Sequence, residues 1–266
     1  MKLKIVKAST GLQWVKLGIL TFFKQPLALA GLFFMFMASV AIASMVPLLG
    51  SALALCLLPA ATLGLMAATQ EANKGKFPTP TILLSAFRAG RQRLNAMVML
   101  GLLYAGGFLI VMGVSALVDG GSFAKAYLLG EALSREAATS PAFQTAMWVS
   151  MALYLPLSLM FWHAPALVHW HNVPPVKSLF FSMVACLRNF GAFTVYGLAW
   201  MGVFLLAGLA MTILSVLFGS PELAATAMLP MALVMASMFF TSIYFSFLDC
   251  FDAEPAAEPE VPEVLG

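Results

Sequence analysis

The histidines are the first candidates for chemistry in this sequence, because an imidazole can bind a metal or move a proton near neutral pH. His163 is the only histidine expected inside an apolar segment, which makes it a candidate proton relay, ligand contact or metal ligand. The alternative is an interfacial histidine bonded to water or to a backbone carbonyl that Pro165 leaves free. His169 and His171 follow six and eight residues later, a spacing that does not place two imidazoles on one helix face. The sequence therefore predicts no metal site and no cofactor.

Nucleophilic catalysis finds little support in the residue spacing. A membrane hydrolase would need a serine beside a histidine or lysine base, or a pair of aspartates. Ser158 is five residues before His163, and side chains five residues apart diverge around a helix. We therefore expect a protein that is not an enzyme, and we treat the polar and proline residues of the predicted bundle interior as a non-catalytic candidate site. Its members are His163, Trp162, Tyr154, Pro59 and Pro156.

Basic side chains form a second candidate site, for the anionic headgroups of membrane lipids. Its members are Arg88, Arg91, Arg93, Lys177 and Arg188. Lys and Arg beside a membrane-spanning segment bind lipid phosphates, but they also serve simply to hold helices at the membrane surface, and both interpretations are open for this set. The sequence contains no glycine-rich phosphate-binding motif, so nucleotide binding has no support. We also expect no nucleic acid as a partner.

These side chains belong to a chain that is too apolar for a soluble fold. Of its 266 residues, 62% are hydrophobic and 9% are charged, about a third of the roughly 25% that a soluble domain carries. Span-length windows predict an all-α polytopic membrane protein with six transmembrane helices. The predicted spans lie near 27–46, 48–70, 94–118, 143–168, 190–218 and 223–248. Residues 1–251 then form a single membrane domain, and residues 252–266 form a disordered acidic tail.

The distribution of positive charge predicts the orientation of the chain. Of fourteen Lys and Arg residues, five precede residue 25, five lie in 71–93, and Lys177 and Arg188 precede the fifth span. Lys125 and Arg135 alone lie in the opposite connections. Because positive residues accumulate on the cytoplasmic side, both termini are predicted to be cytoplasmic, in the inner membrane of a bacterium. No Asp, Glu, Lys or Arg falls in the central turns of a predicted span, which argues against coupling through a buried carboxylate.

An amphipathic surface helix is predicted on the cytoplasmic side before each odd-numbered span. The apolar stripes are Leu83, Phe87, Gly90 and Leu94 in the segment 83–94, Leu179, Phe180, Met183, Val184 and Leu187 in the segment 176–188, and Trp14, Gly18 and Phe22 before the first span. In the second of these segments, Ser178, Ser182 and Asn189 fall on the opposite face. Such helices lie along the membrane surface with their apolar side in the lipid. The segment before the first span also has the tryptophan and lysines of an interfacial anchor.

Each even-numbered span contains a Leu-Pro pair, at residues 58–59, 155–156 and 229–230. Three copies of a surface helix, an outward span, a turn and a kinked return span would make a threefold internal repeat. Alternatively, the pairs arise by chance in a leucine-rich chain with 15 prolines. Proline is tolerated in a span where neighbours satisfy the freed carbonyl, and shared kinks would open gaps between the helices.

Several blocks of sequence carry a resemblance to known proteins. They are Phe22-Phe23-Lys24-Gln25-Pro26-Leu27-Ala28, Phe161-Trp162-His163-Ala164-Pro165-Ala166-Leu167-Val168 and Phe181-Ser182-Met183-Val184-Ala185-Cys186-Leu187-Arg188-Asn189, with Val195-Tyr196-Gly197-Leu198-Ala199-Trp200 after the last. On these residues the chain resembles an uncharacterised family of bacterial six-helix inner-membrane proteins, over all but the extreme N-terminus and the acidic tail. More distantly, it is similar to the membrane domain attached to some glycerophosphodiester phosphodiesterases, although it has no phosphodiesterase catalytic domain. Neither resemblance implies an activity or catalytic residues.

Together these features predict a non-enzymatic inner-membrane protein that organises membrane components or serves as an accessory subunit of a complex. Anionic membrane lipids are the expected partners, and the acidic tail suggests a protein partner as well. The alternative is a transporter or channel for a small or apolar solute that passes between Pro59, Pro156 and His163.

Overall fold

The computed structural model describes residues 2–46, 49–219 and 221–251, so the predicted acidic tail at 252–266 lies outside the described residues. Within the described residues the chain is helical, with no strand beyond a single bridge between Leu3 and Phe251. Six of the helices are long and apolar enough to cross a membrane, which confirms an all-α polytopic membrane protein. They are α2 (Pro26–Ser44), α3 (Gly50–Asn73), α5 (Arg91–Asp119), α8 (Pro141–Phe161) with its continuation α9 (Ala164–His171), α11 (Phe190–Leu217) and α12 (Pro221–Cys250).

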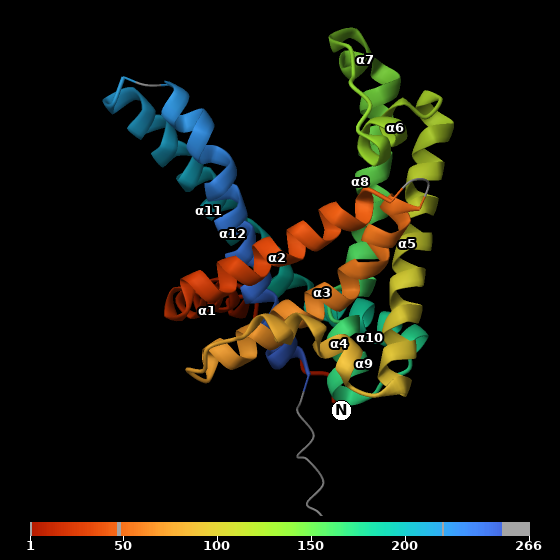
Figure 1. Ribbon diagram of the computed structural model, residues 1–266, viewed down its shortest axis with the longest axis vertical. Coiled ribbons are helices and arrows are strands. Elements are labelled where there is room, and N and C mark those ends of the chain that lie inside the picture. The colour runs from red at the N-terminus through yellow and green to blue at the C-terminus, as the bar shows by residue number, and fades with distance from the viewer. Residues whose placement is uncertain (1, 47–48, 220, 252–266) are drawn as a thin grey trace, which may run out of the picture.

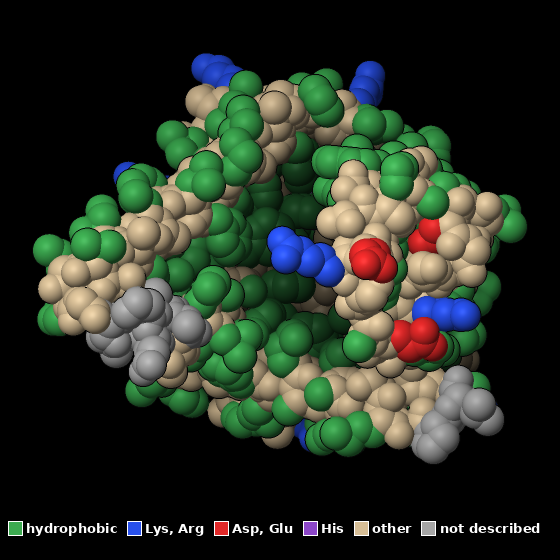
Figure 2. Space-filling view, turned by 90° about the horizontal axis from the view of Figure 1, so that it is seen from above, with side chains coloured by type: hydrophobic (Ala, Val, Ile, Leu, Met, Phe, Trp, Pro, Cys, Tyr) green, Lys and Arg blue, Asp and Glu red, His purple; other side chains and the backbone are tan. Residues whose placement is uncertain are grey.

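The long helices form three pairs, α2 with α3, α5 with α8, and α11 with α12. In Figure 1 the α11–α12 pair leans away from the α5–α8 pair, and the two diverge toward the end of the molecule that carries α6 (Ser122–Leu129) and α7 (Arg135–Thr139). Seen from that end, the molecule has a hollow between the pairs whose walls are hydrophobic side chains (Figure 2). The pairs therefore meet at the opposite end, near the N-terminus.

A shorter helical segment precedes each pair. These segments are α1 (Thr10–Lys24), the 3₁₀ helix η1 (Pro80–Leu84) with α4 (Ser85–Arg88), and α10 (Pro175–Arg188). Pro59, Pro156 and Pro230 each lie inside the second long helix of a pair. The same order of elements thus recurs along the chain, while the threefold internal repeat in sequence stays a prediction.

The short helices end where the backbone cannot continue a regular helix. Gln25 takes φ −142° and ψ 58°, and Pro26, which has no N–H, begins α2. Gly90 takes φ 93°, a conformation that glycine adopts without strain, and it separates α4 from α5. The prediction of one helix with a continuous stripe from Leu83 to Leu94 is therefore wrong, because Leu94 belongs to the membrane-spanning helix α5.

The fourth predicted span is also interrupted. Pro165 has no N–H to donate to the carbonyl of Phe161, and its ring crowds that carbonyl, so α8 ends at Phe161. Trp162 and His163 occupy the break before α9 begins. The expectation of an unbroken helix over 143–168 is wrong for this reason.

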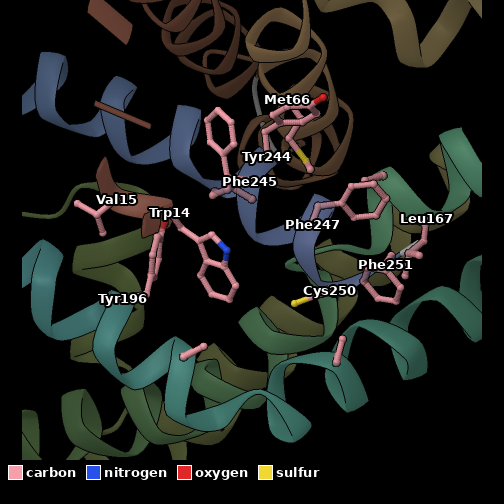
Figure 3. Packing of buried hydrophobic residues seen from close by; sticks show 14 of the residues in the cluster. Trp14, Val15, Met66, Leu167, Tyr196, Tyr244, Phe245, Phe247, Cys250 and Phe251 are labelled. Carbon is pink, nitrogen blue, oxygen red and sulfur yellow. The ribbon is translucent and has the colours of Figure 1, made fainter. Parts of the chain in front are cut away.

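The face of α1 that was expected to lie in lipid is enclosed by protein. α1 packs against α11 and α12, and a methyl group at Gly18 would overlap Ser242 of α12. Trp14 is fully buried, and its Nε1–H donates to Asp249 Oδ2 at 2.7 Å; Figure 3 shows it within the cluster of buried hydrophobic residues. The interpretation of Trp14, Gly18 and Phe22 as an interfacial anchor is therefore wrong.

The first residues of the chain are tied to the end of α12. The N–H of Lys4 donates to the carbonyl of Cys250 at 2.9 Å. The side-chain amide of Asn189 continues this pairing, since its Oδ1 accepts from the N–H of Val6 at 2.8 Å and its Nδ2 donates to the carbonyl of Lys4 at 3.0 Å. Asn189 is buried, so it acts here as a substitute for a strand backbone. Both ends of the described chain therefore meet at one end of the molecule.

Candidate functional site

A cavity of about 270 Å³ lies where the three helix pairs come together. It is lined by Leu58, Pro59 and Thr62 of α3, Tyr104 of α5, Tyr154, Ser158 and Phe161 of α8, Trp162 of the break, and Phe239, Phe240 and Ile243 of α12. Of the predicted interior site, Pro59, Tyr154 and Trp162 meet at this cavity, whereas Pro156 and His163 are not among the residues that line it. A mostly apolar, aromatic wall with a few hydroxyl groups is typical of a small-molecule pocket.

Proline residues weaken the helices beside this cavity. Pro59 has no N–H, and one turn later Thr62 Oγ1 donates at 2.9 Å to a carbonyl of its own helix, four residues earlier. Pro156 repeats the pattern in α8, where Ser158 Oγ donates at 2.8 Å to a carbonyl three residues earlier. A missing backbone hydrogen bond and a hydroxyl that bonds back to the backbone both favour bending. Pro156 thus contributes to the shape of the site without lining it.

A pair of tyrosines provides the principal polar group of the cavity. The hydroxyl oxygens of Tyr104 and Tyr154 lie 3.1 Å apart, within hydrogen-bonding distance. Tyr104 is 8% exposed and Tyr154 is 39% exposed, so the pair is buried at one end and open at the other. The rings of Phe108 and Phe161 pack edge-on against these tyrosines. Sequence analysis selected Tyr154 but missed Tyr104, since no local pattern connects two residues fifty positions apart.

His163 is fully buried beneath the cavity, in the break between α8 and α9. In a regular helix its N–H would donate to the carbonyl of Leu159. Instead, Ser182 of α10 inserts its hydroxyl, which accepts from the N–H of His163 at 2.9 Å and donates to the carbonyl of Leu159 at 2.8 Å. The break therefore leaves neither backbone group without a partner. The imidazole of His163 was considered as a partner for a carbonyl freed by Pro165, but its hydrogen-bond partner among the described residues is a serine of α12.

The imidazole of His163 meets a serine that sequence analysis did not pair with it. His163 Nε2 lies 3.1 Å from Ser246 Oγ of α12, and Trp162 Nε1–H donates to the same oxygen at 3.1 Å. Ser246 Oγ in turn donates to the carbonyl of Ile243 at 2.8 Å. Because that bond uses the only hydroxyl proton, Nε2 must be the donor to Ser246, and an imidazole protonated at Nε2 cannot take a proton from this serine.

The burial of this serine and histidine also bears on their chemistry. Both residues have no exposed surface, and neither lines the cavity. His163 Nδ1 has no hydrogen-bond partner among the described residues, so no carboxylate orients the ring as in a catalytic triad. Ser246 therefore joins α12 to the helix break through a buried hydrogen bond, and Ser182 joins α10 to the same break. Ser158, the serine considered from the sequence, bonds to its own helix instead.

The five predicted headgroup contacts lie at the junctions between short and long helices. Arg88 ends α4, Arg91 and Arg93 begin α5, and Lys177 and Arg188 lie at the two ends of α10. α5 contacts both α4 and α10. All five side chains are exposed except Arg93, which is half-buried. Among the described residues, none of the five takes part in an ion pair.

The polarity of α10 is the reverse of that of an ordinary surface helix. Its serines lie on the inner face of the helix: Ser178 and Ser182 have no exposed surface, and both pack against the rest of the protein. Three of its apolar side chains point outward, with Val176 64%, Phe180 63% and Leu187 49% exposed. The sequence pattern revealed the two faces, but not that the polar one is turned toward protein.

Comparison with known proteins gives one informative relative. A probable inner membrane protein of Burkholderia thailandensis is 40% identical to this chain over 265 residues, which cover 98% of each of the two chains. No family model matches the chain. No solved structure matches it either.

Proposed function

The chain belongs to the same family as this probable inner membrane protein of Burkholderia thailandensis, and on that premise we propose that it is a non-enzymatic, lipid-associated protein of the bacterial inner membrane. In this role it binds anionic lipid at the end where the helix pairs meet, and organises the lipid around it or a partner complex. Its six apolar helices hold it in the bilayer.

The reversed polarity of α10 is the observation that carries this proposal. Exposed Val176, Phe180 and Leu187 would be costly in water, whereas against acyl chains they cost nothing. Lys177 and Arg188 flank this apolar face at either end of the helix. A helix with an outward apolar face between two exposed bases fits a position in which the face contacts acyl chains and the bases reach lipid phosphates.

The charges at the start of α5 support an anionic ligand independently. Arg91 and Arg93 lie in the first turn of this helix, where the helix dipole already concentrates positive charge. These arginines therefore do not stabilise the helix, and a bound anion would relieve the unfavourable charge. Lys177 is in the same situation in the first turns of α10.

The proposed orientation follows from the same charges. Twelve of the fourteen basic residues lie in the N-terminal segment, in the short helices α1, α4 and α10, after α3, or in the first turn of α5, at the end where the pairs meet. Lys125 and Arg135 lie on α6 and α7 at the other end. By the positive-inside rule the first end is cytoplasmic. In this orientation both termini are cytoplasmic, and the hollow of Figure 2 opens toward the outer side of the membrane.

Native mass spectrometry tests the lipid-binding role. The protein is reconstituted with phosphatidylglycerol and phosphatidylethanolamine, and the lipids that stay bound when the protein is released into the gas phase are identified. Arg91→Gln with Arg93→Gln should reduce the retained phosphatidylglycerol. Lys125→Gln with Arg135→Gln removes the same charge from the opposite end and should not. Equal retention in the two double variants, or in the first and the unaltered protein, would overturn the proposal.

The cavity favours a second candidate function, transport of a small or apolar solute. The bundle interior is not solidly packed, since about 270 Å³ lies between the helix pairs beside Pro59. Transport through this space predicts solute flux into proteoliposomes that responds to a bulky substitution such as Thr62→Phe. His163→Ala, which alters a buried residue outside the cavity lining, tests whether the path continues through the break. Absence of flux for the unaltered protein would remove this candidate.

A further inference from the structure

We infer that the cavity between the helix pairs binds a neutral, lipid-soluble molecule through a carbonyl oxygen, with the Tyr104–Tyr154 hydroxyl pair as the donor. This site is separate from the basic end of the molecule. Tyr104 follows Arg91 by 13 residues of α5, which is about 20 Å along the helix axis. The inference therefore goes beyond the proposed binding of anionic headgroups and can fail or succeed independently of it.

The hydroxyl pair has one hydrogen to spare. Two tyrosine hydroxyls carry two hydrogens, and the bond between Tyr104 and Tyr154 uses one of them. The hydroxyl that accepts in this bond keeps its own O–H, for which the described residues offer no acceptor. Both tyrosines line the cavity, so whichever hydroxyl keeps its O–H can present it to a molecule there. A donor that stays unpaired in an apolar cavity wall is costly, and this cost favours a ligand that supplies an acceptor.

The remaining lining restricts the chemistry of that ligand. Among the described residues, no Asp, Glu, Lys, Arg or His lines the cavity, so nothing described there would balance a charge, and we infer a neutral ligand. The hydroxyls of Thr62 and Ser158 are engaged by their own helices and do not compete for the ligand. The rest of the wall is apolar or aromatic, which suits a hydrocarbon body. A carbonyl oxygen on an apolar body matches these features, as in a fatty acyl ester or a lipid-soluble quinone.

Trp162 provides a built-in reporter, because its indole lines the cavity. Bromine atoms quench tryptophan fluorescence on contact, so methyl 9,10-dibromostearate is an ester probe for this site and 9,10-dibromooctadecane is its counterpart without a carbonyl. Each is titrated into protein in liposomes, and the same titration of Trp162→Phe is subtracted to remove quenching of the other four tryptophans. We expect saturable quenching of Trp162 by the ester, with weaker quenching by the hydrocarbon.

Tyrosine variants separate a ligand contact from a structural role. Tyr104→Phe and Tyr154→Phe each leave one hydroxyl, whose O–H is then free for the ligand, so each single variant should bind the ester nearly as well as the unaltered protein. The double variant has no donor and should lose roughly five- to tenfold in affinity for the ester only. If the pair merely joined α5 to α8, either single variant would produce the whole effect. The retained rings preserve the packing against Phe108 and Phe161.

Several outcomes would overturn the inference. It fails if the ester does not quench Trp162 saturably, if ester and hydrocarbon bind equally, or if either single variant matches the double variant. A decyl-substituted benzoquinone added as a competitor distinguishes the two sources of the carbonyl: displacement of the ester indicates a quinone ligand, and no displacement indicates an acyl ester. The arginine variants described above should leave these titrations unchanged.

Discussion

Replacement of Ser182 by alanine is the most informative perturbation of the helix break. The hydroxyl of Ser182 takes the place of a backbone hydrogen bond, accepting from His163 N–H at 2.9 Å and donating to Leu159 C=O at 2.8 Å. Ser182→Ala removes both bonds at once and leaves the helix break as it is. Pro165, which causes the break, prevents the helix from simply re-forming across it.

The expected cost follows from the two groups left without partners. An unsatisfied buried backbone group costs about 1 to 3 kcal/mol. His163 is fully buried, so its N–H finds no replacement, whereas the carbonyl of Leu159 keeps a weak contact with Cys186 Sγ at 3.8 Å. Ser182→Ala should therefore lower the free energy of unfolding by about 2 to 4 kcal/mol. This exceeds the average of about 0.6 kcal/mol for side-chain hydrogen bonds in membrane proteins, whose partners can pair again elsewhere.

Ser178→Ala is the matched control for this measurement. Ser178 lies on the same face of α10 and is equally buried, but its hydroxyl bonds at 2.6 Å only to the carbonyl of Pro175 in its own helix. Its loss should cost less than about 1 kcal/mol, since no group of another helix is left unpaired. Unfolding in mixed micelles titrated with sodium dodecyl sulfate, followed by circular dichroism, compares the two variants. Equal stabilities would refute the account of the break.

Three further predictions test packing, burial and orientation. Gly101→Ala should destabilise the fold by about 1 to 3 kcal/mol because the added Cβ would overlap the carbonyl of Cys56. Gly106→Ala is the control: its Cβ meets nothing within 4 Å, so it should be neutral or slightly stabilising. The same unfolding titration compares the two variants. Burial raises the pKa of the Cys186 thiol, so the thiolate fraction at a given pH falls. Maleimide at pH 8 should therefore leave Cys186 unmodified until the chain is denatured. Peptide mapping that finds Cys186 labelled in the folded protein would contradict its burial. A green fluorescent protein fused after Gly266 should fluoresce, since it folds in the cytoplasm. A fusion truncated after Glu131, between α6 and α7, places the fluorescent protein on the outer side and should stay dark. The reverse pattern would invert the proposed orientation.

The six spans were predictable because each is specified by a local apolar run. Their ends shifted little, and the one interruption has a local cause in Pro165, which sequence analysis noted without drawing the break at Phe161. The positions of the basic residues were predictable in the same way. Arg91 and Arg93 were expected at the end of the surface helix before the third span, whereas the structure places them in the first turn of α5.

The contacts of the candidate site were not predictable, because they join distant parts of the chain. The hydroxyls of Tyr104 and Tyr154 meet across fifty residues, and His163 meets Ser246 across 83. The amphipathic pattern of α10 likewise predicts two faces but not their environments. In water the serines would face the solvent, whereas a protein in lipid buries such polar groups against each other. Ser182 is on the inner face for that reason.

The lipid that accompanies the protein out of its own membrane tests the central claim most directly. The chain is extracted in polymer-bounded native nanodiscs, and the lipids and proteins that copurify are identified and compared with the bulk membrane. We predict enrichment of anionic phospholipid around the unaltered protein, and loss of that enrichment when Arg91 and Arg93 are replaced by glutamine. A lipid composition equal to that of the bulk membrane, unchanged by these substitutions, would contradict it.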